Sequence, residues 1–162
     1  MDEATLLTGL RAALADGVLA ASKAPDDVPA LTIRPEALLP LVRTLRGRPY
    51  GLDVLLDLTC LDDPASAVRF TVVYHFASFA PPARLRIKLP AAGDAPAVDS
   101  LTPFWANAAW LEREVYDLFG VRFKGHPDLR RLMLHEGFAG HPLRKDYPAR
   151  RRQPVAPEEE AP

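Results

Sequence analysis

The chain has 162 residues, of which 48% are hydrophobic and 25% are charged. This balance is that of an ordinary globular domain and excludes a wholly disordered or fibrous chain. A domain of 17.8 kDa buries roughly 70% of the surface of its unfolded chain, which is enough for one hydrophobic core. The single cysteine, Cys60, excludes an internal disulfide and a self-contained iron–sulfur cluster. Any redox chemistry therefore needs a cofactor held elsewhere.

No apolar run approaches the roughly 18 residues of a membrane helix, and the acidic start MDEATLL differs from the basic start of a secretion signal. We therefore expect a soluble protein of the cytoplasm. The net charge of −1 is unevenly distributed: residues 1–121 carry a net −4, residues 122–152 a net +6, and the EEE at 158–160 a further −3. A basic block of this kind is typical of a solvated tail, a nucleic-acid arm or a segment that docks on an acidic protein, and composition leaves all three open.

The first helix is predicted at residues 4–15, where leucines recur at helical spacing and Gly17 supplies a stop. The stretch at 30–35 is typical of a short strand, and Pro35 suits the opening of a second helix. Pro40 removes a backbone donor, so that this helix is either kinked there or starts later.

Three strands are predicted at 52–61, 68–76 and 84–89, because the hydrophobic period changes there from 3.6 to 2. Short connectors rich in turn residues predict that they pair as an antiparallel meander with helices on its apolar face. The fold class is therefore α+β. In the first strand one face is predicted to hold Leu52, Val54, Leu56, Leu58 and Cys60.

Residues 90–104 are predicted to form a loop that leads into a helix with Asn107 as its N-cap and Gly120 as its stop. From residue 121 onward, frequent proline and glycine leave no room for a long element. We therefore expect an α+β domain over 1–121 and an extended basic docking tail over 122–162. The acidic, proline-rich end of this tail is expected to be mobile.

The chain lacks the usual motifs of nucleotide binding and hydrolysis, namely GxGxxG, GxxxxGK[ST], HExxH, GxSxG and CxxC. His126, His135 and His141 are 9 and 6 residues apart, without the tight spacing of most zinc sites, so we expect no metal site. Two of them lie in Gly-His-Pro units, which favours a role in shaping the backbone. No catalytic or cofactor-binding residue is predicted.

The charged side of the helix at 107–119 has two interpretations. Arg113 and Asp117 are four residues apart and can form an exposed ion pair, worth only about 0.3–0.5 kcal/mol. Alternatively, Glu112, Arg113, Glu114 and Asp117 form a polar cluster suited to ion pairs within a protein interface. The residues alone favour the exposed pair.

The basic segment at 122–152 has two interpretations as well. It can neutralise phosphates, with aromatic rings available to stack on bases. Against this, the isoelectric point is near 6.4, no nucleic-acid-binding motif is present, and apolar residues such as Leu129 and Met133 are interleaved with the charges. We therefore expect a protein partner and no nucleic acid.

The run EREVYDLFGVRFKGHPDLRRLML at 112–134, followed by GFAGHPLRKDYP at 137–148, closely resembles the signature of the 30-kDa subunit, also designated C, of respiratory complex I. The resemblance is tight over 110–148 and looser over 30–90. The family fold is a small mixed, mainly antiparallel sheet flanked by helices, with an extended irregular C-terminal tail, and this agrees with the periodicity. The signature positions are filled by Glu112, Arg113, Glu114, Asp117, Leu118, Phe119, His126 and Arg130.

The resemblance implies an accessory role in the proton-translocating NADH:quinone oxidoreductase. Family members carry no cofactor, while FMN, iron–sulfur clusters, NADH and quinone bind to other subunits. They lie in the hydrophilic arm, at the cytoplasmic face of the bacterial cell membrane, against the quinone-facing D subunit, to which they are fused in some bacteria. We therefore expect no autonomous activity and a rigid interface that holds the D subunit in place.

On this basis the charged helix end becomes an interface, which reverses the interpretation as an exposed pair. The tail is expected to become ordered only on docking, because it lacks periodicity. An equivalent subunit of a membrane-bound hydrogenase or a ferredoxin-fed quinone reductase remains an alternative, as does a nucleic-acid-binding module that uses the basic tail. The expected interface residues are Glu112, Arg113, Glu114, Asp117, His126, Arg130, Arg131, His141, Arg144, Lys145, Asp146 and Tyr147.

Overall fold

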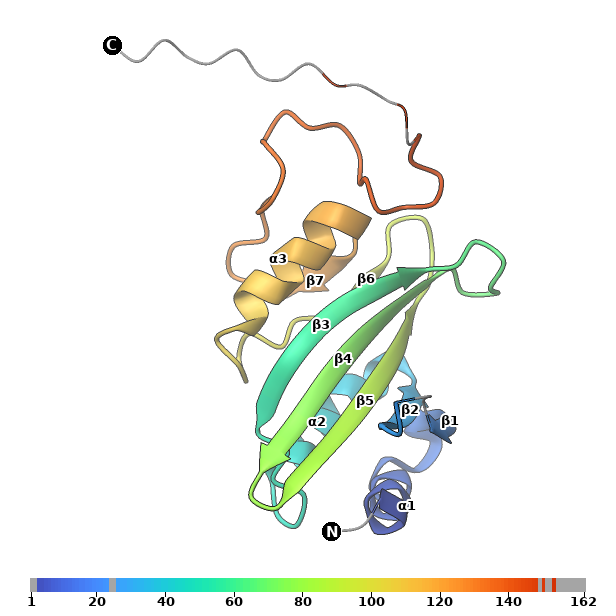
Figure 1. Cartoon of the computed structure of the whole chain (residues 1–162), viewed down its shortest axis with the longest axis vertical. Helices are drawn as coiled ribbons and strands as arrows, with labels where there is room; N and C mark the ends of the chain where they lie inside the picture. Colours follow the sequence, from blue (N-terminus) through green and yellow to red (C-terminus); the bar gives the residue numbers. More distant parts are fainter. Residues whose placement is uncertain (1–2, 24–25, 149, 151–152, 154–162) are drawn as a thin grey trace.

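The computed structural model describes residues 3–23, 26–148, 150 and 153. A five-stranded sheet carries the helices on one face, and the C-terminal segment folds back over the last helix (Figure 1). No helix in the described ranges is long and apolar enough to cross a membrane. The prediction of a mobile acidic end covers 153–162, and all of these residues except Gln153 lie outside the described residues. In chain order the elements are α1 (Glu3–Leu14), the 3₁₀ helix η1 (Ala15–Gly17), β1 (Val18–Lys23), β2 (Pro29–Ile33), the 3₁₀ helix η2 (Pro35–Ala37), α2 (Leu38–Arg46), β3 (Val54–Asp62), β4 (Phe70–Phe79), β5 (Pro82–Ala91), β6 (Ala97–Asp99), α3 (Ala108–Phe119) and β7 (Arg122–Lys124).

The large sheet has the strand order β1-β2-β5-β4-β3. All neighbours are antiparallel except β2 and β5, which are parallel. The predicted α+β class and the predicted meander of β3, β4 and β5 are therefore confirmed. The edge strand β1 was not predicted, because its residues are mostly exposed and show no hydrophobic alternation.

The core forms between the sheet and the helices. Alternate residues of β4 and β5 point toward the helices, as their period of two predicts. The largest of them are Phe70, Tyr74 and Phe76, which are at most 1% exposed. Burial of each large apolar side chain contributes about 1.5–3 kcal/mol. The opposite face of the sheet, turned toward the viewer in Figure 1, carries no helix within the described part of the chain.

The predicted face of β3 is wrong at Leu56. A bulge between Leu55 and Asp57 shifts the register of β3 against β4. An extra residue in one strand exchanges its two faces on either side of the bulge. As a result Leu55 is buried and Leu56 is 44% exposed, whereas Leu58 and Cys60 remain in the core.

The helix boundaries follow the predicted signals closely. Pro35 opens η2, and α2 starts at Leu38, which agrees with the prediction of a later start. Pro40 is then the third residue of α2, where the missing N–H has no helical partner to lose. Helix α3 starts after Asn107 and ends at Gly120, whose φ of +75° is left-handed. The predicted capping role of the Asn107 side chain is wrong, because this side chain makes no hydrogen bond to the helix and its Nδ2 instead donates to the carbonyl oxygen of Leu55 at 2.8 Å.

One prediction for the second half of the chain is wrong in detail. The predicted loop at 90–104 contains the end of β5 and all of β6, and β6 pairs in parallel with β7. Strands of three residues are too short to show a period, so the sequence gives no signal for them. Residues 126–148 are irregular, as predicted, but they turn back and lie over α3 (Figure 1).

Candidate functional site

Three polar side chains of α3 are buried: Glu112 and Asp117 are fully buried and Arg113 is 9% exposed. Glu114 is exposed. The interpretation of Arg113 and Asp117 as an exposed ion pair is therefore wrong. Each of them instead binds the backbone of a segment that follows α3 in the chain.

Arg113 binds two successive carbonyl groups. Its Nε donates to the carbonyl oxygen of Arg130 at 3.1 Å, and its Nη2 donates to that of Arg131 at 2.8 Å. The planar guanidinium also lies over the ring of Trp110, with Cζ 5.2 Å from the ring centroid. The fork of donors thus fixes the chain direction at 130–131.

Asp117 binds the next part of the same segment. Its Oδ2 accepts hydrogen bonds from the N–H groups of Leu132, Met133 and Leu134 at 3.0, 2.8 and 2.9 Å. Its Oδ1 accepts from Nη1 of Arg131 at 2.6 Å. Successive N–H groups around one oxygen form an anion-binding concavity, filled here by a side chain of the same protein.

The charge of Asp117 follows from these contacts. Burial raises its pKa, but the N–H group of Leu134, the guanidinium of Arg131 and the two other N–H groups together outweigh burial, so that the pKa lies below its usual value. Asp117 is therefore ionised at neutral pH. Four donors around one buried carboxylate make this the most heavily bonded side chain of α3.

The end of α3 is capped by the segment that comes back over it. The last four carbonyl groups of a helix have no partner within the helix, and here each one meets a donor. Positively charged groups at this end are also favoured by the helix dipole. In order, Gly120 N–H donates to Tyr116 O (2.8 Å), His141 Nδ1 lies 2.9 Å from Asp117 O, Leu143 N–H donates to Leu118 O (3.1 Å) and Arg144 Nε donates to Phe119 O (2.6 Å).

Gly120 makes this cap sterically feasible. A Cβ atom at this position would lie 2.6 Å from Nη2 of Arg144 and equally close to the ring of His141. The first Gly-His-Pro unit works in a similar way, because Nε2 of His126 lies 3.0 Å from the carbonyl oxygen of Ala109 on α3. Both units therefore place an imidazole on a carbonyl group of α3.

The segment is finally anchored to the end of the sheet. The N–H group of Lys145 donates to Oδ2 of Asp62 at 2.6 Å. Arg69 donates to both carboxylate oxygens of Asp62, at 2.6 and 2.8 Å, and to Asp146 at 2.9 Å. The Arg69 guanidinium, together with the N–H group of Lys145, holds the pKa of Asp62 below its usual value. Asp62 and Arg69 were not predicted as site residues, although their places on either side of the β3–β4 turn bring them together.

The outer part of the segment packs on itself. The rings of Phe138 and Tyr147 stack with centroids 6.0 Å apart. Arg131 lies over Phe138, and its Nη2 donates to the carbonyl oxygen of Gly140 at 3.0 Å. Gln153 Nε2 donates to the Tyr147 hydroxyl at 2.8 Å. These contacts are made within the chain, and whether 126–148 holds this shape before docking stays a prediction.

Glu112 points to a different segment, the loop before α3. Its Oε1 accepts from the N–H of Leu101 at 2.6 Å, and its Oε2 accepts from the hydroxyl of Ser100 at 2.7 Å. Burial raises the pKa of Glu112 to about 7, although both hydrogen bonds act in the lowering direction. This role of Ser100 was not predicted, since nothing in the sequence marks which residue 12 positions away meets a helix side chain.

The predicted interface residues are thus brought together largely by contacts within the chain. Glu114 is exposed, and Arg130 pairs at the surface with Asp128 at 2.9 Å. Contact of any of these residues with another protein stays a prediction. Part of the basic block at 122–152 is engaged within the chain, because Arg131 is paired with Asp117 and Arg144 caps α3.

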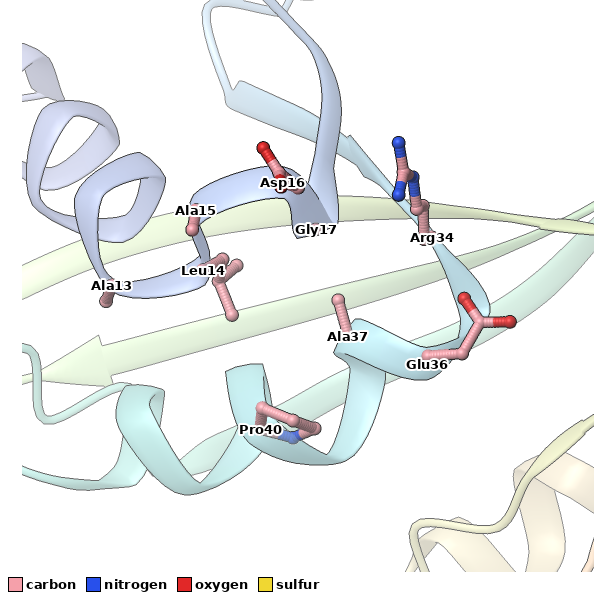
Figure 2. A pocket seen from close by; sticks show the side chains of 9 residues that line it. All are labelled: Ala13, Leu14, Ala15, Asp16, Gly17, Arg34, Glu36, Ala37 and Pro40. Atoms are coloured by element: carbon pink, nitrogen blue, oxygen red, sulfur yellow. The ribbon is translucent and has the colours of Figure 1, made fainter.

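A cavity of about 590 Å³ lies between the end of α1 and the start of α2 (Figure 2). Small residues line most of it, with the charged groups of Asp16, Arg34 and Glu36 among them. It contains none of the predicted site residues. Within the described ranges, no group of three or more His, Cys, Asp or Glu side chains is placed to hold a metal ion. Cys60 is a core residue, and burial raises the pKa of its thiol to about 12.

The fold and these contacts define a class of protein: an α+β domain whose charged helix organises the backbone of its own C-terminal segment. Residues 31–153 match the family model described as the 30-kDa subunit of respiratory-chain NADH dehydrogenase. The match includes the sheet from β2 onward, α3 and the segment over it. The chain belongs to this family, the 30-kDa subunit of complex I.

Curated relatives agree with this assignment. The chain is 40% identical over 149 residues to the C subunit of the NADH-quinone oxidoreductase of Roseiflexus sp., a match that covers 91% of this chain and 85% of that protein. It is 48% identical over 119 residues to the C subunit of the Azorhizobium caulinodans enzyme, over 73% of this chain and 56% of that protein. It is 45% identical over 141 residues to the C/D polypeptide of Gluconacetobacter diazotrophicus, over 82% of this chain and 24% of that protein. The chain therefore spans about half of the second relative and about a quarter of the third.

Solved structures confirm the fold. The trypsin-resistant fragment of Nqo5 superposes with a TM-score of 0.69 at 28% identity, covering 80% of this chain and all of that fragment. A chain of the membrane-bound sulfane sulfur reductase, an archaeal respiratory membrane complex, superposes with a TM-score of 0.74 at 18% identity, over 90% of this chain and 85% of that one. The second likeness shows a shared fold only.

Proposed function

We propose that this chain is the cofactor-free, non-catalytic 30-kDa subunit of a proton-translocating NADH:quinone oxidoreductase and that it holds the quinone-facing D subunit in place. FMN, iron–sulfur clusters, NADH and quinone then bind to other subunits. The chain lies in the hydrophilic arm, as a peripheral protein at the cytoplasmic face of the cell membrane. The family match over 31–153 is the observation that carries this proposal.

Rigid support requires a surface whose shape is fixed before the partner binds. Contacts within the chain support such a fixed shape for the segment at 126–148, because Arg113 and Asp117 bind its backbone and Arg144 caps α3. A segment that ordered only on docking would lose about 1–2 kcal/mol of backbone entropy per residue at that step. The α3 cluster therefore acts on the interface indirectly, by fixing the segment in advance.

The exposed residues around this segment supply the contact surface in the proposal. Trp110 is 60% exposed, Met133 64% and Leu143 49%, so large apolar side chains face solvent on α3 and on this segment. Glu114 and Arg130 add exposed charges beside them. Large apolar groups with charges around them are typical of a protein–protein interface.

The relative designated C/D supports the D subunit as the partner. Its name describes one polypeptide that carries both subunits, and this chain matches 24% of its length. A covalent link between two modules keeps each at a high effective concentration near the other. A fusion of the C and D modules is compatible with function when the two modules lie side by side, which favours the D subunit as the partner.

The first test is assembly. A tagged version of this chain is expected to migrate on a native gel of gently solubilised membranes in a large particle that reduces quinone with NADH. Migration as a free species of about its own mass, while such a particle forms without it, would refute the proposal. A particle that oxidises hydrogen or reduced ferredoxin, but not NADH, would favour the related hydrogenase or ferredoxin-fed enzyme.

The second test concerns the surface. We expect Met133→Asp to reduce the amount of assembled particle strongly while the isolated chain keeps its unfolding midpoint. Leu19→Asp is the matched control, because Leu19 is also about half exposed but lies on β1, at the sheet edge opposite the one that α3 covers. Equal assembly of both variants would contradict an interface on the 126–148 segment.

A further inference from the structure

The buried cluster around Glu112 has a property that the support role does not use. Glu112 is fully buried, and its two carboxylate oxygens meet only neutral donors, the Ser100 hydroxyl and the Leu101 N–H. Among the ion pairs of the described residues none includes Glu112. A buried carboxylate without a cation is costly to ionise.

The hydrogen bonds around Ser100 can accommodate a proton on Glu112. Oγ of Ser100 lies 2.8 Å from Oγ1 of Thr102, and either atom can be the donor; it also accepts the N–H of Thr102 at 3.1 Å. When Glu112 is ionised, Ser100 donates to it. When Glu112 is protonated, its O–H can donate to Ser100, which then donates to Thr102. Both forms are hydrogen-bonded without any movement of heavy atoms.

The same hydroxyl groups form a path to the surface. Thr102 is partly exposed, Ser100 is 4% exposed and Glu112 is fully buried. Consecutive distances of 2.8 and 2.7 Å along this row are those of good O–H···O hydrogen bonds. A proton can therefore exchange between Glu112 and water through two hydroxyl groups.

Among the described residues no charged group contributes to the pKa shift of Glu112, which comes from burial and its two hydrogen bonds. Tyr74 on β4 is fully buried, its hydroxyl has no partner among the described residues, and burial followed by the charge of Glu112 raises its pKa well above the usual value. It stays neutral. Asp99 and Cys60 act on Tyr74 in the same direction. The other charged groups of α3 and β7 do not face Glu112. Arg113 binds the carbonyl groups of 130–131, and Asp117 binds the N–H groups of 132–134. Exposed charges are those of Glu114, Arg122 and Lys124.

We propose that Glu112 is a reversible protonation site, buried under the 100–102 loop and connected to solvent through Ser100 and Thr102, and that its ionisation favours opening of this loop. An open loop exposes the carboxylate to water, where the charged form is stable, whereas the closed loop favours the neutral form. The raised pKa of about 7 places the change in the physiological range. This inference does not depend on which complex contains the chain.

The test is hydrogen exchange of the Leu101 amide in the full chain, corrected for its intrinsic rate at each pH. Because opening releases Glu112 to its ordinary pKa, we expect protection of this amide to fall about tenfold between pH 6 and pH 8. Glu112→Gln should abolish this dependence. Glu114→Gln, a change at an exposed position two residues further along α3, should preserve it.

A direct titration keeps the proposal testable if a variant fails to fold. The side-chain carboxyl carbon of Glu112, followed by NMR in wild-type protein labelled at glutamate, is expected to titrate near pH 7. Ser100→Ala removes one donor to the anion and should move this midpoint upward by about one pH unit. A midpoint in the ordinary glutamate range, or protection of Leu101 that does not change with pH, would overturn the proposal.

Discussion

Glu112 and Asp117 lie on the same helix, are both fully buried, and both hold the backbone of an irregular segment, yet the two carboxyl groups differ in charge behaviour. Asp117 receives three N–H groups and a guanidinium, and its pKa is below the usual value. Glu112 receives one N–H and one hydroxyl, and burial raises its pKa to about 7. Burial alone therefore does not decide the charge; the number and charge of the donors do.

The difference separates two regions around α3. The segment at 126–148 is held by a carboxylate that is ionised across the neutral range. The loop at 100–102 is held by a group that changes charge within that range. If the chain supports a neighbouring protein through the first region, the contacts of Asp117 that hold this region keep their charge across the neutral range, whereas the second region can respond to pH.

The largest expected effect is that of removing the permanent charge. Asp117→Ala should lower the free energy of unfolding by about 3–5 kcal/mol, because the guanidinium of Arg131 and three N–H groups lose their common acceptor in a buried place. Urea unfolding at pH 7 measures it. Glu114→Ala is the control on the exposed side of α3 and should change stability by less than about 0.5 kcal/mol. A loss of unfolding free energy below about 1 kcal/mol for Asp117→Ala would contradict the role of Asp117 as the charge that holds the segment.

The next effect is the pH dependence that distinguishes Glu112. Its folded pKa of about 7 lies above the unfolded value of 4.5, so its contribution to stability is fully present below pH 4.5 and is lost as the pH rises to about 7. The loss is about 3 kcal/mol in total. Unfolding free energies of wild type and Glu112→Gln between pH 5 and 8 should therefore converge at low pH and separate at high pH, with the variant less affected.

Other groups titrate in part of this window. Burial lowers the pKa values of His75 and His141, so their contribution to stability grows as the pH rises toward 6.5. Because the Glu112→Gln variant retains both histidines, the difference between the two proteins isolates Glu112. Parallel pH profiles of wild type and variant would show that Glu112 is ionised throughout, like Asp117.

A smaller effect is expected at the cap of α3. Gly120→Ala should cost about 1–2 kcal/mol, because φ is +75° and the added Cβ would collide with His141 and Arg144. Gly137→Ala is the matched control within the same segment, since its Cβ would meet its nearest neighbour at 3.5 Å. Thermal unfolding of the two variants measures the difference. Equal midpoints would mean that the 141–144 stretch does not rest on the helix end.

The smallest effect is expected at the exposed anchor. Asp146 is 59% exposed and meets Arg69 at the surface, so Asp146→Asn should change stability only slightly, and less in high salt. Urea unfolding at low and high ionic strength checks this. A large and salt-independent loss would show that the end of the segment, and not Asp117, determines its attachment.

Sequence reasoning succeeded where one face of an element is apolar. The alternation in β4 and β5 predicted their buried faces, and the signals at Asn107 and Gly120 gave the bounds of α3. It failed at the bulge beside Leu56, because a single inserted residue leaves no mark in the pattern. The strands β6 and β7 were missed because three residues are too few to show a period of two.

The sequence named the residues of the α3 cluster as interface residues, a role that stays a prediction, and it did not give their contacts within the chain. Arg113 and Asp117 were recognised through the family resemblance, whereas the pattern of the helix alone placed them on an exposed face. The sequence does not distinguish a buried polar side chain from a solvated one. The partners of Arg113 and Asp117 also lie 14–18 positions away along an irregular segment. Asp62 and Arg69, which anchor the segment from another part of the chain, were missed because nothing local requires them there.

The most direct test of the central claim is hydrogen exchange of the isolated full chain at pH 7, read at the amides of Leu132, Met133 and Leu134. If Asp117 holds the segment within the chain, these three amides are strongly protected before any partner is present, and they lose protection together in Asp117→Asn. Exchange at the rates of an unstructured peptide in the wild-type chain would contradict the account, and would mean that the segment is shaped by its partner.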